Sequence, residues 1–249
     1  MAFTFNKKTN GVKNRLIATI QKKGEETDVY LNIEPATIKE GHITSIVGNG
    51  DKIIPIIDKS LRSVIYVAGA SGSGKSYFVA KWIHNALQFY KGEEVFLFSP
   101  IKNDPSLNTL KYTAIELNQD IRDMSVDDFK DSFVIFDDCD TIRDKQVASL
   151  VSGLRDELLE TGRHTSTKMV ITSHLISNFK ETRRVLNEAT AIVIYPNSSG
   201  TYSIKQYLKT YLGLNKAQIE RILKVKDRWC LISKSYPIYV LTESEIFIP

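Results

Sequence analysis

The chain has 249 residues, of which 42% are hydrophobic and 25% are charged, and its formal net charge is +4. This length and composition are typical of a globular α/β domain with an appendage and argue against intrinsic disorder. Cys139 and Cys230 are too few for a disulfide framework and lack the C-x-x-C spacing of a zinc or redox site. The sequence begins without the apolar stretch of a signal peptide, and no apolar run is long enough to span a membrane. We therefore expect an intracellular protein with no membrane partner.

The first sixty residues predict a small β-rich unit, because short alternating runs are separated there by turn residues. Two hairpins are expected in it, the second because an Asn-Gly pair favours a tight turn. Their predicted strands are 17–22 with 29–33, around Gly24, and 43–47 with 52–57, around residues 48–51. Since isolated hairpins are marginal in water, residues 1–60 should pack against the rest of the chain or against another subunit.

A phosphate-binding loop is predicted at residues 69–76, whose sequence GASGSGKS matches G-x-x-x-x-G-K-[ST] in full. The loop follows an apolar run and precedes a helical pattern, as this motif requires. Its backbone N–H groups would face one anion, Lys75 would reach the outer phosphates, and the Ser76 hydroxyl would join the shell of Mg²⁺. The alternative is a glycine- and serine-rich turn that matches by accident. We expect ATP and Mg²⁺ as ligands, with nucleotide contacts from Gly69, Ala70, Ser71, Gly72, Ser73, Gly74, Lys75, Ser76 and Tyr77.

From residue 61 onward, strand and helix patterns alternate, which implies a mostly parallel sheet covered by helices. In the helical segment 77–87, Phe78, Trp82 and Ala86 are four apart and would pack on that sheet. The predicted strands are 64–68, 95–99, 133–137, 168–172 and 191–195. The fold class is therefore α/β, with a P-loop NTPase core over residues 61–249 and a small N-terminal β-rich unit. Ligands of such sheets bind beyond the carboxyl ends of the strands.

Two carboxylates follow the third of these strands, in the sequence FVIFDD. Four apolar residues followed by two carboxylates are the second signature of nucleotide hydrolases, after the phosphate loop. In this interpretation Asp137, at the strand end, would hold the Mg²⁺ shell. Asp138 would face the γ-phosphate and orient or deprotonate the attacking water. Many related hydrolases have glutamate at the second position, so aspartate shortens the reach of this base by one methylene. A strand that merely ends in a polar turn is the alternative.

The fourth strand is followed by Ser173 and His174, where a third contact to the γ-phosphate would lie. Either side chain could sense that phosphate, and an ordinary loop histidine is the alternative interpretation. Just before this strand, Gly162 is suited to the C-terminal turn of a helix, and Arg163 follows it. Displayed at a subunit edge, Arg163 could stabilise transition-state charge on a neighbour's γ-phosphate, an effect of about 10³–10⁵ in rate. A plain surface arginine is equally compatible with the sequence. The other arginines that could act on a neighbour's γ-phosphate are Arg155, Arg183 and Arg184.

The loop GASGSGKS, the strands VFLFSP and FVIFDD, and TGRH followed by MVITSH resemble the genome-packaging ATPases of poxviruses and other large DNA viruses. These ATPases belong to the FtsK–HerA superfamily, and the resemblance covers residues 61–195. Members commonly have glutamine at the end of the fourth strand, where this chain has His174. The resemblance implies a ring of identical subunits that spends ATP to drive double-stranded DNA into a preformed capsid, with Arg163 acting across the subunit interface. It also implies a capsid component as partner and a place in the cytoplasm of an infected host cell or in association with the virion.

The C-terminal part, from about residue 197, is basic, with eight Lys and Arg residues against two acidic residues between positions 205 and 234. Two helices are predicted there, 203–212 and 216–225, the second opened by an Asn215–Gln218 cap, before a strand pair at 229–232 and 238–241. The basic face of the helices either remains solvated or contacts a nucleic-acid phosphate backbone, and the sequence favours neither.

Other nucleotide-binding classes fit the sequence less well than a DNA motor. A small-molecule kinase normally needs an arginine-rich lid, and none is evident. A transporter-type ATPase requires an L-S-G-G-Q signature that the chain lacks, and a nucleotide switch would not need the Asp137–Asp138 pair. A DNA-directed ATPase of another role ranks second, and the kinase third.

Overall fold

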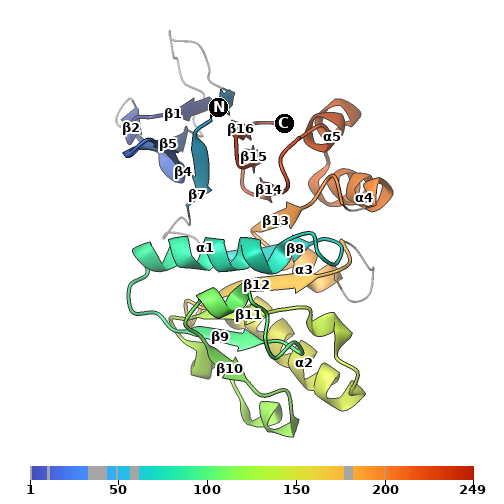
Figure 1. The fold of residues 1–249 in the computed structure, drawn as a ribbon. Coiled ribbons are helices and arrows are strands. Elements are labelled where there is room, and N and C mark those ends of the chain that lie inside the picture. The colour runs from blue at the N-terminus through green and yellow to red at the C-terminus, as the bar shows by residue number, and fades with distance from the viewer. Residues whose placement is uncertain are drawn as a thin grey trace. The chain divides into compact units, whose positions relative to one another are not determined.

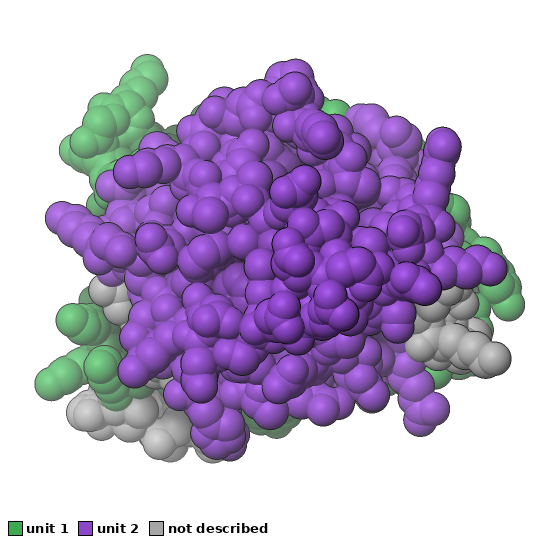
Figure 2. Space-filling view, turned by 90° about the horizontal axis from the view of Figure 1, so that it is seen from below, with its two compact units in different colours: residues 1–61, 193–249 green, residues 62–192 purple. Residues whose placement is uncertain are grey.

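A computed structural model describes residues 2–9, 12–32, 44–48, 50–56, 62–176, 182–198 and 200–249. The chain forms two compact units, which Figure 2 marks in different colours: unit 1 contains residues 1–61 and 193–249, and unit 2 contains residues 62–192. The phosphate loop and the acid pair that the sequence predicts both belong to unit 2. The predicted division of the chain into residues 1–60 and 61–249 stays a prediction.

Unit 2 is built on a parallel sheet whose strands appear in Figure 1. In spatial order these strands are β10 (Thr113–Ile115), β9 (Val95–Phe98), β11 (Phe133–Phe136), β12 (Lys168–Ser173) and β8 (Val64–Ala68). The predicted strands of this sheet are confirmed, with ends that differ by at most one residue, and β10 is an additional strand. β13 (Ala191–Ile194), also predicted, leads from unit 2 into unit 1. The mostly parallel α/β fold is therefore confirmed.

Helices cover both faces of this sheet. α1 (Lys75–Phe89) contacts β8 and β12, and its Trp82 ring meets Phe133 of β11 edge-on at 6.2 Å between ring centroids. Phe136 is three residues further along β11 and so faces the opposite side. There it lines a small cavity together with Arg155 of α2 (Lys145–Thr161) and Val185 of α3 (Arg183–Glu188). The predicted stripe on α1 is confirmed, since Phe78, Trp82 and Ala86 are all buried.

Short 3-10 helices connect the strands of unit 2, namely η1 (Leu107–Thr109), η2 (Gln119–Asp123), η3 (Val126–Phe129) and η4 (Cys139–Thr141). An aromatic cluster joins η3 to the sheet. Phe129 contacts Phe96 edge-on, and Phe98 stacks on Phe136 with 4.7 Å between centroids. This packing anchors the carboxyl ends of β9 and β11, the strand ends from which the site residues project.

The N-terminal part of unit 1 forms an antiparallel sheet. Its strands are, in spatial order, β1 (Ala2–Thr4), β5 (Glu25–Asn32), β4 (Arg15–Lys22) and β7 (Lys52–Pro55), with a separate pair β2 (Lys8–Thr9) and β3 (Val12–Lys13). The β4–β5 pair confirms the first predicted hairpin, which turns at Lys23 and Gly24. The second predicted hairpin is wrong: β7 pairs with β4, whereas β6 (Ser45–Val47) pairs with β16 (Glu245–Phe247). Asn49 of its predicted turn lies outside the described residues.

The C-terminal part of unit 1 contains two helices and three strands in the described residues. They are α4 (Thr201–Leu212), α5 (Lys216–Leu223), β14 (Cys230–Ser233), β15 (Tyr239–Leu241) and β16. The predicted cap is confirmed, because Asn215 and Gln218 exchange side-chain to backbone hydrogen bonds at 3.0 and 2.9 Å. β14 and β15 form the predicted antiparallel pair. Across the described parts of both units, we find no helix with the length and apolar character of a membrane span.

Candidate nucleotide-hydrolysis site

The predicted phosphate loop joins the end of β8 to the start of α1. Gly72 and Gly74 have φ angles of 74° and 103°, in the left-handed region that favours glycine, and they turn the chain into the helix. The Gly69 N–H donates to the Ser173 carbonyl at 3.1 Å, which ties the loop to the end of β12. In the fully described loop and first turn, the N-terminus of α1 has neither a side-chain cap nor an acidic residue. The positive end of the helix dipole therefore suits an anion.

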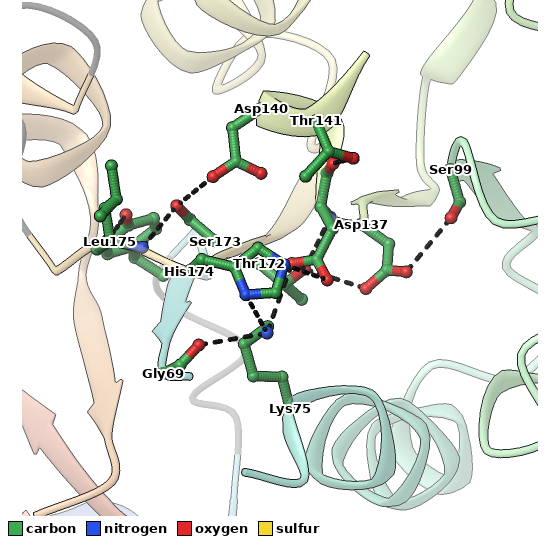
Figure 3. Close-up of polar contacts among 12 residues, drawn as sticks. Gly69, Lys75, Ser99, Asp137, Asp140, Thr141, Thr172, Ser173, His174 and Leu175 are labelled. Carbon is green, nitrogen blue, oxygen red and sulfur yellow. Dashed lines mark hydrogen bonds and ion pairs between the residues drawn. The ribbon is translucent and has the colours of Figure 1, made fainter. Parts of the chain in front are cut away.

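Lys75 lies next to two other predicted catalytic side chains, Asp138 and His174; Figure 3 labels Lys75 and His174. Its buried ammonium lies 3.5 Å from Asp138 Oδ1 and 3.4 Å from His174 Nδ1, and it donates to the Gly69 carbonyl at 3.2 Å. His174 Nε2 in turn lies 3.2 Å from Asp138 Oδ2. Lysine, histidine and carboxylate thus form a closed triangle.

The contacts of His174 assign its tautomer. An ammonium group can only donate, so Nδ1 must accept the proton of Lys75. The imidazole proton then resides on Nε2 and points toward the Asp138 carboxylate. In this arrangement His174 bridges Lys75 and Asp138.

The two carboxylates differ in their surroundings. Asp137 is fully buried, and its oxygens accept from the Thr172 hydroxyl at 2.9 Å and the Ser99 hydroxyl at 3.2 Å. Burial raises the pKa of Asp137 above its usual range; the hydrogen bond from Thr172 opposes this shift, and the charge of Asp138 adds to it. Asp138 has a φ of 44°, an uncommon left-handed conformation for a residue with a side chain. Unlike Asp137, Asp138 has two basic partners, Lys75 and His174.

The structure separates the two candidate sensors, Ser173 at the end of β12 and His174 directly after it. The Ser173 hydroxyl donates to Asp140 Oδ2 at 2.8 Å and points away from Lys75, whereas His174 lies against Lys75 and Asp138 (Figure 3). Successive side chains of an extended strand face opposite sides, which explains the division. The geometry favours His174 over Ser173 as the side chain next to a bound phosphate.

Ser76 and Asp137 are chemically suited to Mg²⁺, because a hydroxyl and a carboxylate are the hard oxygen ligands that this ion prefers. Ser76 lies in the first turn of α1 and is partly exposed. The parts of the chain that the structure describes hold no group of three or more His, Cys, Asp or Glu side chains that could bind a metal ion. Mg²⁺ usually takes one or two protein ligands and completes its shell with phosphates and water, so this pair fits it when a nucleotide is bound.

Arg163 is exposed in the segment that connects α2 to β12, and its side chain makes no hydrogen bond or ion pair with the described residues. Two of its rivals are held in place: Arg155 pairs with Asp156 at 2.7 Å, and Arg184 pairs with the same carboxylate at 2.6 Å. Arg183 is exposed like Arg163. The structure does not bring Arg163 to the triangle of Lys75, Asp138 and His174, and its action on another subunit stays a prediction.

Arg62, just before β8, anchors the segment that carries Arg163. Its guanidinium donates to the carbonyls of Leu158 and Leu159 at the end of α2 and to the Thr167 carbonyl, the last two at 2.7 and 3.0 Å. Gly162 ends α2 as predicted, but it has a right-handed φ of −58°. Glycine is needed there for space, because an added Cβ would lie 2.5 Å from the Leu158 carbonyl and 2.8 Å from the Arg62 guanidinium.

Ser99 and Thr172 are site residues that the sequence did not single out, and the same holds for Arg62, which anchors the Arg163 segment. Ser99 follows β9 and Thr172 lies near the end of β12, the two strands that flank β11. Polar residues at the carboxyl ends of strands next to the acid-bearing strand are therefore a usable signal, but it requires the strand order.

Comparison with known proteins yields one relative that is close in sequence. The uncharacterized protein V3 of Sputnik virophage is 39% identical over 196 residues, which span 78% of this chain and 80% of V3. No family model matches the chain.

Among solved structures, the conjugation coupling protein TcpA of pCW3, a monomer with ATPγS, is similar with a TM-score of 0.52 and 14% identity. The match covers 94% of this chain and 76% of TcpA. The genome packaging NTPase B204 of Sulfolobus turreted icosahedral virus 2, in complex with AMPPCP, gives a TM-score of 0.47 and 14% identity over 72% of this chain and 96% of B204. The likeness to TcpA shows a shared fold, and the identity to V3 shows that the chain belongs to the family of this virophage protein.

Proposed function

We propose that this chain is a magnesium-dependent ATPase that works as a ring of identical subunits and translocates double-stranded DNA into a viral capsid. The observation that carries the ATPase proposal is the cluster of Lys75, Asp138 and His174, joined by contacts of 3.2–3.5 Å at the end of the phosphate loop. A phosphate-binding loop next to a pair of carboxylates supplies the groups that phosphoryl transfer to water requires.

In this proposal each group has one role. The loop N–H groups and Lys75 hold the phosphates, and Ser76 and Asp137 hold Mg²⁺, which would neutralise charge on the phosphate oxygens. A bound γ-phosphate would compete with Asp138 for the Lys75 ammonium, now 3.5 Å from it. Release of Lys75 leaves a carboxylate oxygen of Asp138 able to accept a hydrogen bond from the attacking water.

His174 and Arg163 complete the proposed site. The Nε2 proton of His174 keeps the Asp138 carboxylate oriented, while Nδ1 lies where the ammonium of Lys75 approaches the phosphate. Arg163, exposed at the end of α2, would reach the γ-phosphate bound by a neighbouring subunit. Because Arg62 fixes the backbone on both sides of it, the arginine would be presented at low entropic cost.

The DNA-packaging role is supported by the motif resemblance and by the viral source of V3. If the resemblance extends to partners, a capsid component binds the ring, and the protein acts in the cytoplasm of an infected host cell or with the virion. The fold shared with a conjugation coupling protein favours a second candidate, an ATPase that acts on DNA in another role.

The exposed face of α4 is the surface that we propose for DNA. Tyr202 is 78% exposed, and Lys205 and Lys209 follow it at spacings of three and seven residues, so the three share one face of the helix. Both lysines are exposed, and neither has an ion pair among the described residues. Lysines on one helix face can contact successive phosphates of a nucleic-acid backbone.

Hydrolysis of ATP by the purified chain, with and without double-stranded DNA, tests this function. We expect turnover that requires Mg²⁺, increases with DNA, and loses its DNA stimulation as salt rises, because phosphate contacts weaken with salt. Lys75→Ala is the matched control and should abolish hydrolysis and weaken ATP binding, since it removes the ammonium that holds the outer phosphates. Unchanged turnover in Lys75→Ala would refute the site.

A second experiment tests whether the lysines of α4 bind DNA. Replacing Lys205 and Lys209 together by Gln should reduce DNA stimulation and leave turnover without DNA unchanged. Turnover that ignores DNA under all salt conditions, in a chain that still requires Lys75, would refute DNA translocation by the isolated ring and leave the ATPase proposal intact.

A further inference from the structure

Thr172 is the residue through which the two site carboxylates contact each other. Its side chain is 2% exposed and lies near the end of β12. Its hydroxyl oxygen lies 2.9 Å from Asp137 Oδ1 and 3.0 Å from Asp138 Oδ1. The same oxygen accepts the backbone N–H of Asp138 at 2.8 Å. One buried hydroxyl therefore has three partners on two adjacent acidic residues.

Thr172 cannot donate fully to both carboxylates. A hydroxyl has one proton and two lone pairs, and both carboxylates accept hydrogen bonds when ionised. One lone pair is used by the Asp138 N–H, so the single proton is shared between, or alternates between, Asp137 and Asp138. Each carboxylate also has a partner of its own, Ser99 for Asp137 and His174 for Asp138, so neither depends on Thr172 alone.

The bond from the Asp138 N–H also holds a costly backbone conformation. Asp138 adopts φ 44° and ψ 34°, a left-handed conformation that is uncommon for a residue with a Cβ. This turn redirects the chain directly after β11, so the carboxylate of Asp138 returns toward Lys75. A hydroxyl on the neighbouring strand fixes both the backbone and the side chain of the same residue.

We propose that Thr172 is a positioning residue for ATP hydrolysis, which sets the orientation of the Asp138 carboxylate and links it to the state of Asp137. This inference rests on the proposed function, because it assigns Asp138 to the attacking water. When a cation engages Asp137, the Thr172 proton is left to Asp138 and fixes Oδ1, the oxygen that release of Lys75 opens to the attacking water. Thr172 itself does not touch the nucleotide.

The test compares Thr172→Val, which keeps the shape and removes the hydroxyl, with Thr172→Ser, which keeps the hydroxyl. Positioning of a general base is worth about 10²-fold or more, so Thr172→Val should lower kcat by this order. Binding of ATPγS, measured by calorimetry, should stay near the wild-type Kd. Thr172→Ser should regain most of the turnover. Thr19→Val is the matched control, since its buried hydroxyl also donates to a carboxylate, Asp28 at 3.0 Å, in the N-terminal sheet of unit 1.

Three results would overturn the proposal. The first is normal turnover in Thr172→Val. The second is equal loss in Thr172→Ser and Thr172→Val, because the hydroxyl would then be irrelevant. The third is loss of ATPγS binding in parallel with kcat, together with a similar loss in Thr19→Val, which would indicate general damage to the fold.

A melting-temperature cycle of Thr172→Val with Asp138→Ala decides the matter even if the wild-type chain does not hydrolyse ATP. Such a chain would refute the proposed function but not the contact. Residues in direct contact have non-additive effects, so Thr172→Val should lower the melting temperature less in the Asp138→Ala background than in the wild type. Equal shifts in both backgrounds would refute the link between Thr172 and Asp138.

Discussion

At the scale of single residues, three consecutive polar side chains at the end of β12 have different sets of partners. Thr172 contacts both carboxylates, Ser173 contacts Asp140, and His174 contacts Lys75 and Asp138. Because successive side chains alternate in direction, Thr172 and His174 lie on the side of the phosphate loop. Replacement of adjacent residues on one strand should therefore have unequal effects on hydrolysis.

We expect His174→Leu to lower kcat by about 10²-fold, because it removes both a preorganised donor to Asp138 and the acceptor for Lys75. His174→Gln should retain much of the turnover, since an amide offers one donor and one acceptor. Ser173→Ala should have the smallest effect of the three, because its partner Asp140 does not touch Lys75 in the described contacts. Steady-state ATPase rates check this order, and a larger loss in Ser173→Ala than in His174→Leu would contradict it.

The residues that sequence alone could identify are those inside contiguous motifs. Lys75 and Ser76 stand in the loop pattern, and Asp137 and Asp138 stand at a strand end, so local sequence predicted that they are close to phosphate and metal. Thr172 and Ser99 could not be assigned to the acid pair, because their contacts depend on β12 and β9 flanking β11. The order of strands in a sheet is a property of the folded chain, and a single sequence does not reveal it.

At the scale of elements, the β6 and β7 strands show how distant pairing overrides a local turn signal. The sequence 48–51 favours a hairpin, yet β7 pairs with β4 and β6 pairs with β16, which is 200 positions away in sequence. The Gly48 N–H donates to the Ser244 carbonyl at 2.7 Å, so the residues next to the turn also bond to the C-terminal segment. A turn motif contributes little free energy compared with two strands that each gain a partner.

The end of α2 offers a second test at this scale, with two glycines of one helix as a matched pair. Gly162→Ala should destabilise the protein by about 1–3 kcal/mol, because the new Cβ would clash with the Leu158 carbonyl and the Arg62 guanidinium. Gly153→Ala should instead raise stability by about 0.5–1 kcal/mol, since its Cβ would meet no atom within 4 Å and alanine favours a helix interior. Thermal unfolding measures both, and a melting temperature of Gly162→Ala at or above that of Gly153→Ala would contradict the clash.

At the scale of the whole molecule, the proposed ring separates the groups of one active site between two chains. Lys75 and Asp138 lie together in unit 2, whereas Arg163 is exposed and absent from their contacts. In a head-to-tail ring each interface would join the loop of one subunit to the Arg163 segment of the next. The assembly can therefore be tested with subunits that are defective in different halves of the site.

Arg163→Ala and Lys75→Ala subunits should each be inactive alone and regain hydrolysis when mixed. In an equal random mixture about one interface in four of a head-to-tail ring combines an intact Lys75 with an intact Arg163. Arg183→Ala is the control, since Arg183 is also exposed but is the first residue of α3, a different segment of the chain. No recovery at any mixing ratio would refute action across the interface, and recovery with Arg183→Ala instead would assign the role to Arg183.

All five residues of β8 are buried. Arg62 and Ser63 precede the strand, and Gly69, the first residue of the phosphate loop, follows it. A strand of this length spans about 13 Å and cannot be stretched or compressed without breaking its hydrogen bonds. Hydrogen bonds from Arg62 hold the segment that carries Arg163 next to the start of β8, and the phosphate loop continues from the end of β8. In a ring, a shift of the loop on nucleotide release would be transmitted along this inextensible strand to the arginine, so the nucleotide state of one subunit would set the reach of its arginine into the next.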